Sequence, residues 1–288
     1  MDTGAVVDWF GEHARDLPWR RPGFSAWGTV VSEFMLQQTP VARVVPILEV
    51  WLARWPTPAD LAAASPAEVL RAWGRLGYPR RALALHACAT RIAEQHGNEV
   101  PEDVAALLAL PGIGDYTARA IAVFAHGSRH PVVDTNVRRV LARAVAGAAV
   151  AGAPNARHDL PAMAALLPDD LVAQRAFNAA VMELGAIVCT ARAPRCGECP
   201  LAATCAWRAA GYPPAEGPPA RRQARFEGSD RQRRGLVLAE LRASDVPVPE
   251  GELAAVVPDA AVRERVLTGL AADGLAERDE GGWRLPAG

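Results

Sequence analysis

The chain has 288 residues, half of them hydrophobic and 22% charged, with a formal net charge of −1. This length suits one large domain or two smaller ones, and the composition is that of a globular chain. No apolar run approaches the ~18 residues of a membrane span, and the first residues lack the basic start of a secretory signal, so we expect a cytoplasmic protein with no membrane partner. The net charge does not favour nucleic-acid binding, which must be argued from motifs.

All 31 basic residues are arginine, and the chain contains no lysine. A Schiff base between enzyme and substrate requires an amine. No side chain of this protein can therefore form a Schiff base.

The first 212 residues predict an all-α fold, because strand-like alternation is nearly absent and helix starts are frequent. Thr57–Asp60 and Ser65–Glu68 each combine an N-cap side chain, a proline at the first helical position and an acidic residue three positions after the cap. A helix is expected after each. Further helices are predicted over residues 26–38, 80–96, 103–109, 115–126, 136–147, 159–167 and 172–188.

Glu33 lies among apolar residues in the segment Val30–Thr39. Most helical glutamates reach the surface, and a buried one is costly unless it is paired or used. Burial raises the pKa of a carboxyl group, as a general acid near neutral pH requires. Glu33 is therefore a candidate general acid.

The segment Leu110–Ala118 places a glycine-rich turn at the start of a predicted helix. Gly112 and Gly114 let backbone N–H groups approach a phosphate closely, and a helix N-terminus favours an anion. A Gly-x-Gly turn alone is common and weak evidence. The whole Leu-Pro-Gly-Ile-Gly pattern is similar to the second half of a helix-hairpin-helix, which would bind DNA through its backbone.

Asp134 precedes the helix predicted at 136–147 and lies 20 residues after Gly114. Taken alone, this position is typical of an N-cap. Its spacing from the hairpin resembles that of the Gly-Pro-Asp region in the helix-hairpin-helix superfamily, and this resemblance implies instead that the carboxylate stabilises a positively charged sugar.

Four of the five cysteines fall within 17 residues, as Cys189-x6-Cys196-x2-Cys199-x5-Cys205. Close-spaced cysteines in an intracellular chain more often bind metal than form disulfides. Zinc ribbons usually have two short Cys-x2-4-Cys pairs, and only one is present here. A [4Fe–4S] cluster suits the pattern better, and the spacing resembles the cluster loop of the endonuclease III superfamily. Cys88 is expected to be a core thiol.

Residues 213–229 are rich in proline and glycine and predict a linker between a core at 1–212 and a second domain at 230–288. The second domain predicts short helices, with Val262–Asp273 the clearest, and a terminal hairpin. Helices followed by a hairpin resemble a winged-helix domain. This part carries 8 arginines and 11 acidic residues.

The segment Ser32–Val41 resembles the signature of the adenine DNA glycosylase (MutY) family, and the similarity extends from Leu17 to Cys205. It includes Leu76-Gly77-Tyr78, Tyr116, Asp134-x-Asn136 and Phe177-Asn178. The resemblance implies an HhH-GPD fold and a monofunctional base excision repair enzyme. Its partner would be double-stranded DNA with adenine opposite 8-oxoguanine or guanine. We expect it to act as a monomer, associated with a bacterial nucleoid.

The resemblance also implies residue roles. Glu33 would protonate adenine, Asp134 would stabilise the oxocarbenium-like sugar, and Tyr116 and Asn136 would orient this pair. Trp19 and Arg20 match residues near the extruded adenine, which must leave the helix before its bond is accessible. Four residues match those that insert into the DNA base stack and contact the guanine left unpaired when the adenine is extruded. They are Gln38, Thr39, Leu76 and Tyr78.

Two departures from the family pattern concern specificity. Ala179 stands where the family commonly has a Glu or Gln that touches adenine. Residues 213–288 do not resemble the Nudix-like domain that usually reads 8-oxoguanine. The resemblance therefore leaves open the preferred base opposite adenine and the role of the C-terminal part.

Three other functions remain as alternatives. An endonuclease III-like lyase attacks the sugar with a lysine at the position of Tyr116, and here it would need the terminal amine instead. A thymine or uracil mismatch glycosylase can have tyrosine there, but the Glu-x-Met-Leu-Gln-Gln-Thr string disfavours it. A non-catalytic iron–sulfur DNA-binding regulator would have no need of both Glu33 and Asp134.

Overall fold

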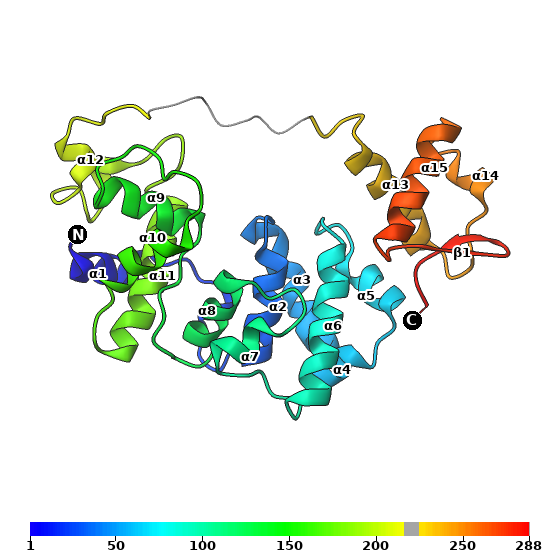
Figure 1. The fold of residues 1–288 in the computed structure, drawn as a ribbon, viewed down its shortest axis with the longest axis horizontal. Helices are drawn as coiled ribbons and strands as arrows, with labels where there is room; N and C mark the ends of the chain where they lie inside the picture. Colours follow the sequence, from blue (N-terminus) through cyan, green and yellow to red (C-terminus); the bar gives the residue numbers. More distant parts are fainter. Residues whose placement is uncertain (216–224, 288) are drawn as a thin grey trace. The chain divides into compact units, whose positions relative to one another are not determined.

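The computed structural model describes residues 1–215 and 225–287, and nearly all its regular structure is helical (Figure 1). This confirms the expected all-α class. No helix within the described residues is long and apolar enough to cross a membrane. The chain divides into two compact units, unit 1 with residues 1–29, 102–109 and 113–219, and unit 2 with residues 30–101, 110–112 and 220–288.

Unit 1 is built around α11 (Leu171–Ile187), against which α1 (Thr3–His13) and α9 (Thr135–Ala144) both pack. Their apolar faces bury Phe177 and Leu184 completely. The α11 helix is the longest of the described part. The remaining elements of unit 1 are η1 (Pro18–Arg20), α7 (Val104–Leu108), α8 (Asp115–Phe124), α10 (Ala156–Ala164), η2 (Cys196–Glu198) and α12 (Ala206–Ala209).

Unit 2 begins within α2 (Ala26–Leu36) and continues through four helices with a tryptophan-rich core. Trp51 meets Trp55 and Trp73 edge-on, at centroid distances of 4.8 and 5.5 Å, and its indole N–H donates to the Ala72 carbonyl. Edge-to-face pairs of this kind add to the free energy gained from burial alone. The four helices are α3 (Val41–Arg54), α4 (Pro58–Ala62), α5 (Pro66–Trp73) and α6 (Arg80–Gln95).

Local sequence signals set several helix starts. Both expected capping boxes are present, with Thr57 accepting from Asp60 N and Ser65 accepting from Glu68 N. The helix expected over 26–38 ends earlier, at Leu36, because the chain turns into a left-handed conformation at Gln38. The helices α1 and α3 were not among the ranges predicted from sequence. In α3, a proline at position 46 inside the helix obscures the signal.

The C-terminal part confirms the expected winged-helix-like order. It contains α13 (Asp230–Ala243), α14 (Glu250–Leu253), α15 (Ala260–Ala272) and the antiparallel hairpin of β1 (Glu277–Asp279) and β2 (Gly282–Arg284). Val248, before α14, forms a bridge with Trp283 of the hairpin. Helix, bridge strand, two helices and hairpin follow one another as in winged-helix domains.

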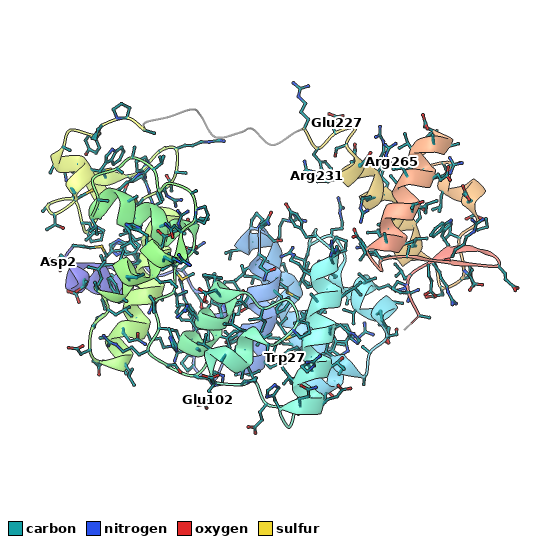
Figure 2. The ribbon with its side chains drawn as sticks, in the orientation of Figure 1. Asp2, Trp27, Glu102, Glu227, Arg231 and Arg265 are labelled. Atoms are coloured by element: carbon teal, nitrogen blue, oxygen red, sulfur yellow. The ribbon has the colours of Figure 1, made fainter. Side chains whose placement is uncertain are left out.

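Of two polar contacts, one lies within the C-terminal part and the other joins this part to α5 of unit 2. Arg265 of α15 (Figure 2) donates to both carboxylate oxygens of Asp230 at 3.1 and 3.2 Å. Arg71 of α5 donates to the Ser244 carbonyl at 2.8 Å. The linker predicted over 213–229 lies partly outside the described residues, since 216–224 are not among them.

Candidate active site and metal centre

Asp134 ends an extended segment and begins α9. Its Oδ1 accepts from Val137 N at 2.7 Å, so the N-cap interpretation is correct. Its Oδ2 accepts from Asn136 Nδ2 at 2.8 Å. Burial raises the pKa of Asp134 above its ordinary value, although these hydrogen bonds and the charge of Arg139 act in the opposite direction. The carboxylate is thus fixed in orientation and partly desolvated, while lone pairs remain available.

A chain of hydrogen bonds links Asp134 to the cysteine loop within unit 1. Asn136 Oδ1 accepts from Arg139 Nη2 at 2.7 Å, and the same Nη2 donates to the Gly185 carbonyl at 2.6 Å. Arg139 Nε donates to the Cys189 carbonyl at 2.6 Å. Gly185 has no room for a side chain, because a Cβ there would lie 2.7 Å from Asn136 Cβ. The position of the carboxylate is therefore coupled to that of the cysteine loop.

The segment before Asp134 is held by buried amides of α11. Asn178 is fully buried, and its Oδ1 accepts from Val132 N at 2.9 Å while its Nδ2 donates to the His130 carbonyl at 3.2 Å. Gln174, one turn earlier, donates to the Ser128 carbonyl at 2.8 Å. Asn178 thus supports the segment that leads to Asp134.

Two further site candidates lie on α2 and α8. Glu33, in unit 2, is 9% exposed on α2 and lies between the fully buried Val30 and Phe34. Its burial agrees with the apolar sequence around it. Tyr116, in unit 1, is partly buried on α8 and packs against Ala120 and Val123.

Two exposed residues of unit 2 have left-handed backbone conformations. Gln38 has φ 57° and Tyr78 has φ 48°, which cost about 1–2 kcal/mol each for residues other than glycine. Tyr78 is 45% exposed, so it is not a core residue, whereas Leu76 is buried at 1% exposed. Thr39 is buried and donates to the Leu76 carbonyl at 3.1 Å. This hydrogen bond ties the two segments together.

The glycine-rich turn has the geometry that the sequence requires. Gly112 has φ 76°, and a Cβ on it would lie 2.8 Å from the Phe34 ring and 2.9 Å from Ala84 Cβ. Only glycine fits there without rearrangement. Gly114 is the N-cap of α8, is exposed, and leaves the first N–H groups of the helix without a side-chain cap. That end of α8 is suited to an anion.

Arg20 is engaged within unit 1, in the segment that also carries Trp19. Glu183 of α11, 1% exposed, accepts from Arg20 at 2.9 Å and from Arg15 at 2.6 Å. Burial opposes the ionisation of Glu183, but these hydrogen bonds outweigh it and hold its pKa at about 2. The ion pair anchors the segment with Trp19 to α11. Ala179 lies one turn before Glu183 on that helix.

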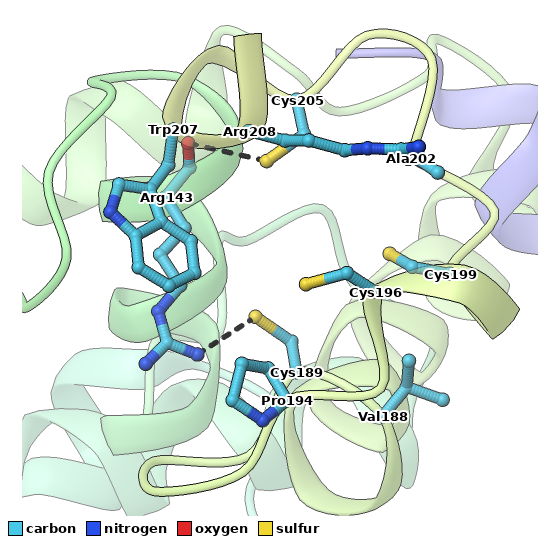
Figure 3. Close-up of a pocket in the computed structure, with 10 residues that line it drawn as sticks. All are labelled: Arg143, Val188, Cys189, Pro194, Cys196, Cys199, Ala202, Cys205, Trp207 and Arg208. Carbon is cyan, nitrogen blue, oxygen red and sulfur yellow. Dashed lines mark hydrogen bonds between the residues drawn. The ribbon is translucent and has the colours of Figure 1, made fainter. Parts of the chain in front are cut away.

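The four clustered cysteines line a single pocket of unit 1, and their side chains surround it (Figure 3). Arg143, 4% exposed, donates to Cys189 Sγ at 3.4 Å and to the Thr190 carbonyl at 2.7 Å, and its guanidinium lies 4.7 Å from the Trp207 ring centroid. Among the described residues, no three His, Cys, Asp or Glu side chains have the geometry for one metal ion. Four thiolates that line one pocket without converging on a single metal position fit a multi-iron cluster better than a zinc ion. The fifth cysteine, Cys88, is fully buried, and burial raises its pKa to about 12, as expected of a core thiol.

Sequence reasoning gave no role to several arginines and one glutamate that organise these sites. Their partners are backbone carbonyls or side chains far along the chain, so no local motif marks them. These residues are Arg15, Arg81, Arg139, Arg143 and Glu183.

Comparisons with known proteins agree with this picture. Residues 31–160 match the HhH-GPD superfamily of base excision DNA repair proteins, and residues 189–205 match the iron-sulfur binding domain of endonuclease III. The chain is 58% identical to the adenine DNA glycosylase of Mycobacterium tuberculosis over 287 residues, which is 99% of this chain and 93% of that protein. This alignment therefore includes residues 230–288.

Two further comparisons cover less of the chain. The human adenine DNA glycosylase is 41% identical over 210 residues, which is 70% of this chain and 38% of the human protein. The structure of a thermostable thymine-DNA glycosylase aligns with a TM-score of 0.65 and 25% identity, over 72% of this chain and 95% of that chain.

Proposed function

The chain belongs to the adenine DNA glycosylase family of the HhH-GPD superfamily, and from this premise we propose that it hydrolyses the N-glycosidic bond of adenine mispaired with 8-oxoguanine or guanine. The observation that carries the proposal is Asp134, a partly buried carboxylate held by Val137 N and Asn136 in a chain without lysine. This carboxylate can stabilise a cationic sugar by its charge. Because the chain has no lysine, it has no side chain that could form a Schiff base with the sugar.

In the proposed reaction, Glu33 donates a proton to the adenine base and converts it into a leaving group. Asp134 stabilises the oxocarbenium-like sugar as the bond breaks, and water adds to the sugar. The two carboxyl groups take different roles, proton donor and stabilising charge, as paired carboxyl groups do in glycoside hydrolysis. The comparison applies because the bond broken here is an N-glycosidic one. Tyr116 and Asn136 orient the pair, and the hydrogen bond from Asn136 to Asp134 supports this assignment.

DNA is the partner of this family, and we propose three contact regions. The turn with Gly112 and Gly114 binds a backbone phosphate at the N-terminus of α8, which has no side-chain cap. Trp19 and Arg20 lie near the extruded adenine, where Ala179 provides no polar contact to the base. The opposing base is read by Gln38, Thr39, Leu76 and Tyr78. The exposure of Gln38 and Tyr78 supports their part in this set.

The chain carries a [4Fe–4S] cluster, in keeping with its match to the iron-sulfur binding domain. We propose Cys189, Cys196, Cys199 and Cys205 as the ligands, because all four line one pocket. Held by these four thiolates, the cluster would cross-link residues 189–205. Through Arg139 this loop is hydrogen-bonded to Asn136, which in turn holds Asp134.

We also propose the domain boundaries and the setting in which the enzyme acts. The glycosylase core comprises residues 1–212, a linker covers 213–229, and residues 230–288 form a separate domain. The enzyme acts as a monomer at the bacterial nucleoid, where its substrate is found.

A second candidate function is excision of thymine or uracil from mismatches. The alignment with the thymine-DNA glycosylase structure favours it, although at much lower identity than the adenine glycosylase of Mycobacterium tuberculosis. Single-turnover excision from four duplexes separates the two functions: A opposite 8-oxoguanine, A opposite G, T opposite G, and thymine glycol opposite A. We expect release only from the two adenine mispairs. Release from T opposite G alone would establish the second candidate instead.

A further inference from the structure

Arg81, in the first turn of α6, reaches two separate segments of unit 2. Its Nη1 donates to the carbonyls of Phe34 and Met35, at 2.8 and 3.1 Å, and to the carbonyl of Gln37. Its Nη2 donates to Thr39 Oγ1 at 2.9 Å and to the Gly77 carbonyl at 3.0 Å. One side chain therefore joins the end of α2 to the turn before α6.

These contacts provide hydrogen-bond donors for backbone carbonyl groups at the end of α2. The last four carbonyls of a helix have no partner within it, and a cation is favourable at that end. Arg81 supplies donors to two of these carbonyls in α2, while Leu36 O accepts from Thr39 N at 3.2 Å. Burial lowers the pKa of Arg81 to about 10, so its guanidinium remains charged at neutral pH.

Gln38 and Tyr78, two of the four non-glycine residues with a positive φ in the described part of the chain, lie on the segments that Arg81 joins. Gln38 lies between two residues that accept from Arg81, and Tyr78 follows the Gly77 carbonyl. The guanidinium carbon of Arg81 is 5.3 Å from the Tyr78 ring centroid and 5.3 Å from that of Trp73. A left-handed conformation in residues other than glycine persists only where its surroundings enforce it.

We propose that Arg81 is a positioning residue that fixes the spacing of Gln38 and Tyr78, and through them sets the selectivity for the base opposite adenine. This inference rests on the proposed function, in which both residues contact that base. Arg81 does not contact DNA itself, because the donors of both its Nη atoms are directed at protein acceptors and its Nε is buried.

The test compares Arg81→Gln and Arg81→Lys with the unaltered enzyme. Single-turnover excision is measured on adenine opposite 8-oxoguanine, opposite guanine, and opposite an abasic-site analogue that offers no base to read. The readout is the excision rate opposite 8-oxoguanine, and likewise that opposite guanine, divided by the rate opposite the abasic-site analogue. A ratio taken on one preparation does not depend on the folded fraction. Arg91→Gln is the matched control, since Arg91 is exposed on the same helix.

We expect both Arg81 variants to lose at least about tenfold in this ratio, equivalent to about 1.4 kcal/mol. The lysine variant keeps the charge but lacks the planar fork that reaches five acceptors, so it should not rescue selectivity. Arg91→Gln should keep the ratio. In a Gln38→Ala/Tyr78→Ala background, adding Arg81→Gln should change the ratio no further, because the coupled residues are already gone.

Several results would overturn the proposal. One is an unchanged ratio in both Arg81 variants of an active enzyme, or rescue by lysine. Another is a salt slope of duplex binding shallower by about one in Arg81→Gln but not in Arg91→Gln, which would make Arg81 a phosphate contact. If neither Arg81 variant folds, Arg81→Met keeps the length of the side chain but has no donor, and it should lower the ratio in the same direction. Failure of the unaltered enzyme to release adenine from any duplex would instead refute the proposed function.

Discussion

Glu33 and Asp134 are the two candidate catalytic carboxyl groups. Glu33 is 9% exposed on α2, and Asp134, whose pKa burial raises, accepts hydrogen bonds from a backbone N–H and an amide. Two carboxyl groups of one enzyme can take opposite roles, one as proton donor and one as a fixed charge. The family resemblance implies that Glu33 is the acid and Asp134 the stabilising charge, and we propose these roles for this chain.

We predict that Glu33→Gln abolishes excision while duplex affinity stays nearly unchanged, because an amide cannot protonate the leaving base. Loss of a general acid typically lowers the rate ~100- to 10,000-fold. Asp134→Asn should have a similar effect through loss of charge stabilisation. Single-turnover rates and binding isotherms measure both. Glu94→Gln, at an exposed position of α6, is the control. More than about a tenth of the original rate in either variant would exclude a catalytic role of that size.

A second prediction concerns the acid limb of the pH–rate profile. Burial raises the pKa of Asp134, and its ionised form is the active one, so the rate should fall as the pH drops through this raised pKa. The charge of Arg139 lowers this pKa. Arg139→Gln should therefore shift the acid limb to higher pH, provided that the cluster absorbance is intact. Arg157→Gln, exposed on α10, should leave the limb in place. A shift to lower pH in Arg139→Gln would refute the assignment.

At the scale of elements, the hairpin offers a matched pair of glycines. Gly112 has a positive φ and no room for a Cβ, whereas Gly114 has φ −99° and open space around it. Gly112→Ala should lower the free energy of unfolding by about 1–3 kcal/mol through strain and overpacking against Phe34. Gly114→Ala should change it by less than about 0.5 kcal/mol. Thermal unfolding of both variants measures this, and equal losses would contradict the structural distinction between the two glycines.

The elements that the sequence predicted well are those with local signals. Capping boxes at Thr57 and Ser65 and the turn at Gly112 depend on residues within a few positions, so their geometry follows from the sequence. Arg81 and Glu183 could not be given roles in this way. Most hydrogen-bond partners of Arg81 lie 42–47 residues away along the chain, and those of Glu183 lie 163–168 residues away. Only the folded chain brings them together.

The candidate site also combines local features, which the sequence predicts, with tertiary contacts, which it does not. Asp134 was singled out by its match to the superfamily pattern, and its N-cap geometry is a local feature. The support it receives from Asn178, Gly185 and Arg139 is tertiary and leaves no pattern in a single sequence. The proposed roles of the DNA-contacting residues come from the family resemblance.

At the scale of the whole molecule, the C-terminal part differs from the core in charge. Residues 230–288 carry 8 arginines against 11 acidic residues, the wrong balance for a phosphate-binding module. Duplex binding becomes salt-dependent through basic groups that neutralise phosphates, with a slope of about −0.9 per contact. This part is therefore better suited to contact a protein than DNA.

We predict that a protein ending at Ser229 retains the single-turnover rate and the salt slope of the full chain. Loss of the hydrogen bond from Arg71 to Ser244 exposes a surface of α5 but removes no proposed site residue. Excision assays and binding isotherms at several salt concentrations provide the comparison. A slope shallower by about two or more in the shortened protein would show that residues 230–288 contact phosphate. A selective loss of activity opposite 8-oxoguanine would assign them the reading of that base.

The central claim is that this chain removes adenine by hydrolysis with two carboxylates and no Schiff base. Product analysis of a single-turnover reaction on a duplex with adenine opposite 8-oxoguanine, with sodium borohydride present in a parallel sample, tests it most directly. The account predicts free adenine, a strand that breaks only after alkali, and no trapped enzyme–DNA adduct, because the chain contains no lysine. Strand scission without alkali together with a borohydride-trapped adduct would contradict it.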